Sequence, residues 1–147
     1  MNYDNIQSLT KMILTSKLSD AEIEEIIKAA KKAKETLSGF ILKKLGQIDM
    51  SVEELSERAN IGRSTMYKII KGKMKPEGDR LLQIAFALKL SAEETQRLLR
   101  LGGRAQLNTD SERDIRILFA LKQQKMLEEV DYDLSRLGLK PISRSEE

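Results

Sequence analysis

The chain of 147 residues contains no cysteine and no histidine. Without cysteine it can form neither a disulfide framework nor a thiolate metal site, which fits a reducing compartment, and we expect a cytoplasmic protein. Without histidine it lacks the commonest general base and the commonest zinc ligand. The remaining serine, lysine, tyrosine and carboxylate side chains show no spacing that sets a nucleophile beside a base. We therefore expect neither an enzyme nor a bound metal or other cofactor.

Long apolar runs and a strong net charge are missing as well. The longest apolar stretches span about five residues, far short of the roughly 20 that a membrane-spanning helix requires. The N-terminus also lacks the basic region followed by an apolar block that marks a secretory signal. The net charge of +3 is too small to identify nucleic acid as a partner, so the distribution of charge matters more than its sum. The sequence predicts neither membrane insertion nor secretion.

What is present favours helices. The chain has only two prolines and 4% aromatic residues, and it is rich in leucine, isoleucine, lysine, glutamate and alanine. We expect an all-α fold. Apolar periodicity predicts a short amphipathic helix over residues 5–16 and, from a capping-box pattern at Ser19, a long helix whose apolar seam runs from Ile23 to Phe40. Gly39 is a candidate for the point that divides this helix from the next, at about residues 40–47.

Two short helices joined by a tight turn are predicted next. The serine hydroxyl of Ser51 can accept a hydrogen bond from the Glu54 amide, and the Glu54 carboxylate can reach back to the Ser51 amide. A helix is therefore expected from Val52 to Ala59. It ends in a turn at residues 60–62, in which an asparagine tolerates positive φ and an isoleucine can point into the core.

The second of these helices carries the most concentrated charge. We expect it over residues 63–70, with Gly72 closing it as a C-cap. Helical periodicity puts its apolar residues on one side and its polar residues on the other. Between Arg58 and Lys75 the sequence has no aspartate or glutamate. The basic residues in that stretch are Arg58, Arg63, Lys68, Lys71, Lys73 and Lys75.

The run from Met50 to Pro76 combines a capping box, a turn of fixed length and a basic Gly-Lys loop that ends in proline. It is followed by Leu81-Leu82-Gln83-Ile84-Ala85-Phe86-Ala87-Leu88. Together these stretches, about a third of the chain, resemble the XRE family of Cro and phage-repressor helix-turn-helix proteins. The resemblance implies a five-helix domain whose second helix crosses phosphates and whose third enters the major groove. It also implies a sequence-specific transcription regulator of double-stranded DNA, more often a repressor than an activator.

By the same resemblance, Arg63 is best placed for a bidentate contact to guanine, with Ser64 and Tyr67 next along the exposed side. Lysines and threonine on and after this helix suit phosphates, which fix register without reading sequence. The predicted DNA-binding set is Ser51, Arg63, Ser64, Thr65, Tyr67, Lys68, Lys71, Lys73 and Lys75. Alternatively, the Tyr67 ring could pack over a neighbouring helix, and the lysines could form an ordinary solvated surface.

The same positions also depart from the family. Glutamine is frequent where this chain has Val52, glycine where it has Asn60, serine where it has Gly62, and glutamate where it has Ile70. The missing glutamine removes one expected contact to a phosphate or a base, and Gly62 removes a hydroxyl cap. The resemblance therefore supports the fold more firmly than it supports individual contacts.

The C-terminal half shows an internal echo. Ile84–Lys89 is echoed by Ile117–Lys122, and Leu98–Gly102 by Leu134–Gly138, which predicts two helical hairpins at about residues 79–101 and 111–137. Chance similarity between amphipathic helices is the alternative. A similar arrangement, over residues 37–142, occurs in bacterial XRE-type regulators with a second hairpin.

We accordingly expect three parts. These are an N-terminal helical extension (1–36), a five-helix repressor-like domain (37–103), and a C-terminal helical hairpin with a tail (104–147). The charged residues of the last part alternate in sign and do not gather into a small-molecule site. We expect it to contact a protein partner instead.

A homodimer is expected, because one helix-turn-helix covers only a half-site. The preferred interface is the seam from Ile23 to Phe40. The other candidate is the apolar edge of the last hairpin, at Leu127, Val130, Leu134 and Leu137, and either surface could instead be intramolecular core. The competing function is a helical protein-interaction module that uses the helix-turn-helix as a scaffold, with an incidental basic surface.

Overall fold

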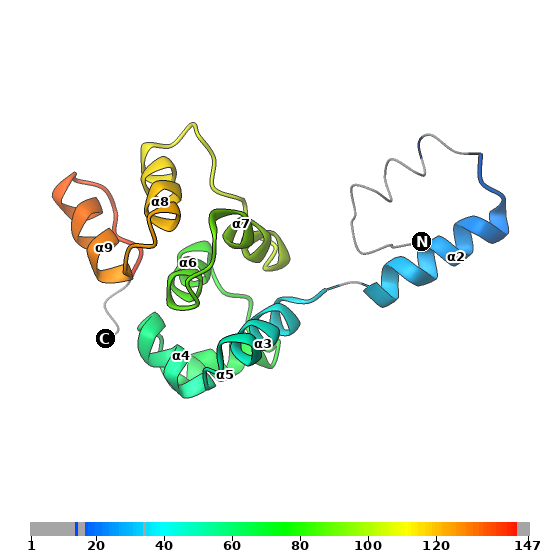
Figure 1. Cartoon of the computed structure of the whole chain (residues 1–147), viewed down its shortest axis with the longest axis horizontal. Helices are drawn as coiled ribbons and strands as arrows, with labels where there is room; N and C mark the ends of the chain where they lie inside the picture. The colour runs from blue at the N-terminus through cyan, green and yellow to red at the C-terminus, as the bar shows by residue number, and fades with distance from the viewer. Residues whose placement is uncertain (1–13, 15–16, 34, 144–147) are drawn as a thin grey trace. The chain divides into compact units, whose positions relative to one another are not determined.

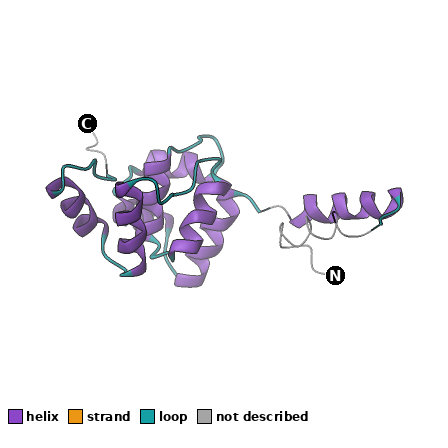
Figure 2. Cartoon of the chain, turned by 90° about the horizontal axis from the view of Figure 1, so that it is seen from above, coloured by secondary structure: helices purple, strands orange, loops and turns teal. Residues whose placement is uncertain are grey.

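A computed structural model describes residue 14, residues 17–33 and residues 35–143 of the chain. Every regular element within these residues is a helix (Figures 1 and 2), which confirms the all-α prediction. The chain forms two compact units, one up to residue 35 and the other from residue 36 onward. The helix predicted over residues 5–16 lies outside the described residues except for Leu14, which is helical. None of the described helices is both long and apolar enough to cross a membrane.

The first unit contains helix α2 (Asp20–Ala33). Its predicted capping box is confirmed, because the Glu22 amide donates to Ser19 Oγ at 3.2 Å and the Ser19 amide donates to Glu22 Oε1 at 3.3 Å. On its apolar side Ile26 is buried, whereas Ile23 and Ile27 are exposed. The predicted seam of α2 is therefore only partly covered.

The prediction of one long helix through residue 40 is wrong. Helix α2 ends at Ala33, and a separate helix α3 spans Leu37–Ile48. The backbone of Thr36 is extended, and its Oγ1 accepts a hydrogen bond from the Gly39 amide at 3.0 Å. This N-cap starts a new helix, because it satisfies a first-turn amide that would otherwise lack a partner. Gly39 thus lies inside the first turn of α3 and does not divide two helices.

The second unit is organised around α6 (Gly78–Ala87), in which residues 81–87 are all buried. Helix α6 packs against α4 (Val52–Ala59), α7 (Ala92–Leu101) and α9 (Leu127–Arg136), as its central place in Figure 1 shows. Helix α3 packs against α7 and against α5 (Arg63–Ile70). Because α6 is covered from several directions, it must be apolar on nearly all sides. This explains why the segment has so few polar residues.

The predicted pair of hairpins is present as α6–α7 and α8–α9, with α8 at Glu112–Lys122. Equivalent points of the two lie 35 residues apart: Lys89 and Gln124 have φ of 54° and 55°, and Gly103 and Gly138 have φ of 69° and 74°. This spacing pairs Ile84 with Phe119, not with Ile117 as the sequence echo predicts. The echo therefore identifies the repeat but places it in the wrong register.

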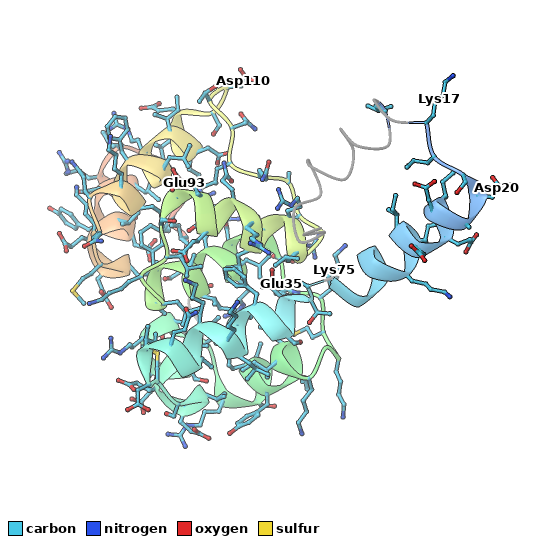
Figure 3. All side chains as sticks on the ribbon, turned by 45° about the vertical axis from the view of Figure 1, so that its right-hand side comes forward. Lys17, Asp20, Glu35, Lys75, Glu93 and Asp110 are labelled. Atoms are coloured by element: carbon cyan, nitrogen blue, oxygen red, sulfur yellow. The ribbon has the colours of Figure 1, made fainter. Side chains whose placement is uncertain are left out.

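Polar contacts fasten the second hairpin to the first. The Arg113 guanidinium pairs with Asp79 Oδ1 at 3.1 Å, and both side chains are mostly buried. In the connection between the hairpins, Arg104 Nε donates to the carbonyl of Pro76 at 2.9 Å. Figure 3 labels Glu93, at the start of α7 in the first hairpin, and Asp110, in the connection just before α8. These contacts make α8 and α9 part of the same compact unit as the predicted five-helix segment.

Candidate nucleic-acid interface

Helix α4 begins as the sequence predicts. Ser51 Oγ accepts a hydrogen bond from the Glu54 amide at 3.1 Å, and Leu55 and Ala59 are fully buried on the inner side of the helix. The predicted return contact from Glu54 to the Ser51 amide is replaced by an ion pair, in which Arg58 lies 2.9 Å from Glu54 Oε1. Ser51 therefore has a structural role as an N-cap in addition to its place in the predicted DNA-binding set.

The turn after α4 is held by its own backbone and by α6. Asn60 has the left-handed conformation (φ 57°, ψ 43°), and Ile61 is buried, as predicted. From α6, Gln83 Nε2 donates to the Ala59 carbonyl at 2.9 Å and lies 3.4 Å from the Asn60 carbonyl. Because the whole Gln83 side chain is buried, it fixes the turn from inside the domain.

No pattern in the sequence predicts this role for Gln83. The only signal was the residue itself, a single polar side chain within the apolar run 81–88. Burying an amide is unfavourable unless it forms hydrogen bonds, so such a residue predicts a backbone partner without identifying it. Its Oε1 has no hydrogen-bond partner among the described residues.

Helix α5 has a buried side and an exposed side. Met66 and Ile69 are buried against the core. At the C-terminus, the Gly72 amide donates to the Ile69 carbonyl at 3.1 Å and the Lys73 amide donates to the Lys68 carbonyl at 2.9 Å. With Gly72 at φ 72°, this is a Schellman motif. The helix-ending role predicted for Gly72 is confirmed, and it sets the direction in which the basic loop leaves the helix.

The structure places the predicted DNA-binding residues on α5, on the loop that follows it, and, for Ser51, at the start of α4. Exposed residues of the set on α5 are Arg63, Ser64, Tyr67 and Lys68, and Thr65 on the same helix is half-buried. Lys71, Lys73 and Lys75 are exposed at the end of α5 and in the loop that follows, and Ser51 is exposed at the start of α4. This exposure suits both phosphate contact and the alternative of a solvated surface.

Two acidic side chains of α4 contact the exposed side of α5. Arg63 lies 3.5 Å from Glu57 Oε1, and both side chains are more than half exposed. The Tyr67 hydroxyl donates to Glu53 Oε1. This hydrogen bond holds the pKa of Glu53 below 4.5 and raises the pKa of Tyr67 above 10.0. Tyr67 thus does contact a neighbouring helix, as the alternative interpretation allowed, but through its hydroxyl.

Comparison with known proteins supports the family resemblance. Residues 41–94 match the family model of the Cro/C1-type HTH DNA-binding domain. The matched segment runs from α3 into α7 and includes α4, the turn and α5, so the predicted resemblance is confirmed for this part of the chain. No curated protein and no solved structure matches the chain. The second hairpin lies outside the matched segment.

Proposed function

We propose that the chain is a transcriptional repressor that recognises a specific double-stranded DNA sequence with α5. The observation that carries the proposal is the two-sided character of this helix within a segment that matches a DNA-binding family. Its apolar side is locked into the core, and its polar side is exposed beside three lysines of the following loop. A helix presented in this way can enter the major groove while the loop neutralises phosphates.

Within this proposal, Arg63, Ser64 and Tyr67 read base edges, and the remaining members of the predicted set contact phosphates. A repressor acts by occupying its operator, which requires affinity and specificity but no further chemistry on α5. The family resemblance favours this sign of regulation over activation.

The test is duplex binding measured over a range of salt concentrations. Arg63→Ala should lower discrimination between specific and random duplexes by ~1 to 3 kcal/mol. Lys73→Ala or Lys75→Ala should weaken binding to all duplexes alike and reduce the salt slope by roughly 1. Lys17→Ala is the control, because Lys17 is an exposed lysine of the first unit, outside the matched segment. A wild-type protein with little duplex affinity at any salt concentration would reject the proposal in favour of a protein-interaction module.

A homodimer remains part of the proposal, but the preferred interface changes. The seam predicted from Ile23 to Phe40 is interrupted by the break after α2, and Leu37 and Phe40 belong to the core of the second unit. The other candidate edge is largely core as well, since Leu127, Val130 and Leu134 are buried and only Leu137 is exposed. Neither surface is available in the form that the sequence predicted.

The second hairpin nevertheless exposes large apolar side chains that a second copy of the chain could cover. Phe119, Met126 and Tyr132 are exposed by 60%, 63% and 68%. Phe119 also lines a groove of about 390 Å³ between α8 and α9. Lys122 at the end of α8 is exposed, and so are Glu128 and Glu129 at the start of α9, whereas Arg116 of α8 is paired with Glu112 of the same helix at 3.3 Å. Opposite charges on adjacent helices allow one surface to complement itself across a two-fold axis.

Analytical ultracentrifugation tests this interface. A Phe119→Glu/Tyr132→Glu variant should sediment as a folded monomer at a concentration at which the wild type is a dimer. The matched control is Ile23→Glu/Ile27→Glu, which places the same charges on the exposed side of α2. Dissociation of the control alone would move the interface to α2, and a monomeric wild type would reject the homodimer and favour a different protein partner.

A further inference from the structure

The contacts between α4 and α5 form a small ladder on the exposed side of the motif. Glu53 and Glu57 are four residues apart and so lie on one side of α4, and Arg63 and Tyr67 have the same spacing on α5. The two pairs run in opposite order, with Glu53 against Tyr67 and Glu57 against Arg63. Each acid therefore holds one of the two side chains best placed to read a base.

We infer that Glu53 and Glu57 are specificity determinants, which occupy Tyr67 and Arg63 in the free protein and release them only to a matching base edge. The inference rests on the proposed DNA-binding function and adds a role for two residues that carry none there. Both acids lie on α4, the helix that the family resemblance implies crosses the phosphates, where a negative charge opposes binding.

The contact between Glu57 and Arg63 is weak enough to be exchanged for a contact to a base. An exposed ion pair at 3.5 Å is weak and is screened by salt, so a stronger partner can replace it. Guanine is such a partner, because its O6 and N7 accept two hydrogen bonds from one guanidinium. At a base pair without this pattern, Arg63 gains less by leaving Glu57.

The same contact limits attraction to the wrong DNA. An unpaired arginine on α5 would reach any phosphate and strengthen binding to every duplex equally. While Arg63 is paired with Glu57, part of that attraction is cancelled, and the Glu57 charge itself repels phosphates. A protein can gain specificity by weakening its complexes with non-matching DNA, in addition to forming favourable contacts with the matching sequence.

Tyr67 is restrained in a related way. Its hydroxyl donates to Glu53, so its single donor is occupied, while its oxygen can still accept a hydrogen bond. A base edge that accepts from Tyr67 must therefore compete with Glu53, whereas an amino group of a base can donate to the hydroxyl oxygen without displacing Glu53. Glu53 therefore restricts the positions from which Tyr67 can read DNA.

The chain offers a matched control for this inference. Glu54 lies on the same helix and is also partly exposed, but its carboxylate pairs with Arg58 of α4 itself. Glu54→Gln removes the same charge at nearly the same place without releasing a residue of α5. A difference between Glu57→Gln and Glu54→Gln therefore reports the pairing with α5 and not the general change in charge.

The experiment uses two duplexes of equal length and composition. One is the tightest binder that the full-length wild-type protein selects from a randomised pool, and the other is its scrambled version. Affinities are measured by fluorescence anisotropy over a series of salt concentrations, and circular dichroism checks that each variant is folded.

Glu57→Gln should strengthen binding to the scrambled duplex by roughly two- to fivefold, with a smaller gain on the selected duplex. The salt slope on the scrambled duplex should steepen by about 1, because Arg63 becomes free to contact a phosphate. Glu53→Gln should likewise reduce the ratio of the affinities for the selected and scrambled duplexes. Restoring the wild-type slope in the double variant Glu57→Gln/Arg63→Ala would support the pairing.

Equal effects of Glu57→Gln and Glu54→Gln on both duplexes would overturn the inference and leave the proposed function intact. If the wild-type protein binds no duplex of the randomised pool more tightly than the others, the proposed function is overturned, and the inference with it. The two failures are therefore distinguishable in one set of titrations.

Discussion

The α6–α7 and α8–α9 hairpins have left-handed residues at equivalent points 35 residues apart, but their first helices meet different surroundings. Ile84 of α6 is fully buried, whereas Phe119, at the equivalent position of α8, is 60% exposed. The difference follows from their neighbours: α6 packs against α4, α7 and α9, and α8 packs against α7 and α9. Burial of a repeated position is thus set by the place of the hairpin in the stack and not by the repeat itself.

Truncating the two equivalent side chains should show the largest contrast. Ile84→Ala should lower the free energy of unfolding by ~2 to 5 kcal/mol, because it leaves a cavity in the most enclosed helix. Phe119→Ala should change it by no more than about 0.5 kcal/mol, because the ring is mostly in water. Urea unfolding followed by circular dichroism measures both. A large loss for Phe119→Ala would mean that this residue is covered in solution, for example by a second copy.

A second contrast concerns the position after the second helix of each hairpin. Gly102 in the first hairpin corresponds to Leu137 in the second. A Cβ on Gly102 would lie 2.5 Å from Leu81 Cδ1, and Leu81 is fully buried. We expect Gly102→Ala to destabilise the protein by about 1 to 3 kcal/mol through overpacking.

The matched variant is Leu137→Ala, which shortens a side chain that is 40% exposed. Its expected effect is within about 0.5 kcal/mol. If thermal unfolding shows the two variants to be equally stable, Leu81 of α6 can move aside for a Cβ at position 102.

The caps of α7 and α9 give a smaller contrast. Ser91 Oγ accepts from the Glu94 amide at 3.1 Å, and Glu94 Oε1 accepts from the Ser91 amide at 3.0 Å, which together form a capping box. At the equivalent place, the Met126 amide donates to Glu129 Oε1 at 3.3 Å. Ser91→Ala should cost about 1 kcal/mol because it removes a hydroxyl cap, and Met126→Ala should cost almost nothing. Chemical denaturation of both variants checks this, and similar losses would contradict it.

The smallest effect concerns acid stability. The hydrogen bond from Lys44 is the main reason that the pKa of Glu94 lies below 4.5, with the Ser91 amide second. A carboxylate with a lowered pKa in the folded state stabilises the protein above its ordinary pKa, and this contribution disappears as the pH falls through the lowered value. Glu94→Gln should therefore flatten the loss of stability below about pH 4.5 relative to wild type.

Melting temperatures measured between pH 3 and pH 7 would show this, with Glu129→Gln as the matched variant in the second hairpin. If the melting temperature of Glu94→Gln falls with decreasing pH as steeply as that of the wild type, the contact with Lys44 is excluded as a source of acid sensitivity.

Local chemistry explains why the helix-turn-helix is predictable from the sequence. The start of α4 depends on the Ser51 hydroxyl, the turn depends on Asn60 in the left-handed conformation, and the end of α5 depends on Gly72. Each of these features is decided within a few residues of chain. For this reason the bounds of α4 and α5 agree with the prediction residue by residue.

The wrong predictions concern features that depend on distant residues or on competition between equally plausible local choices. The apolar spacing from Ile23 to Phe40 is helical throughout, but the Thr36 cap interrupts it, and Phe40 packs in a different unit from Ile26. The contact between Glu53 and Tyr67 joins residues on two helices. Neither residue carries a local signal for it, because only the angle between α4 and α5 brings them together.

The packing of α9 against α6 also affects the order in which the chain can fold during translation. Segments with local contacts fold early, and N-terminal parts fold before the rest has emerged. The helices α3 to α7 leave the ribosome before α8 and α9, and they contain the whole candidate DNA interface. Phe86 and Leu90 of this part share a recess with Leu127 of α9, which is synthesised later. We therefore expect a nascent chain that already presents α5 correctly but still shows an apolar patch, which would attract chaperones until the last hairpin closes over it.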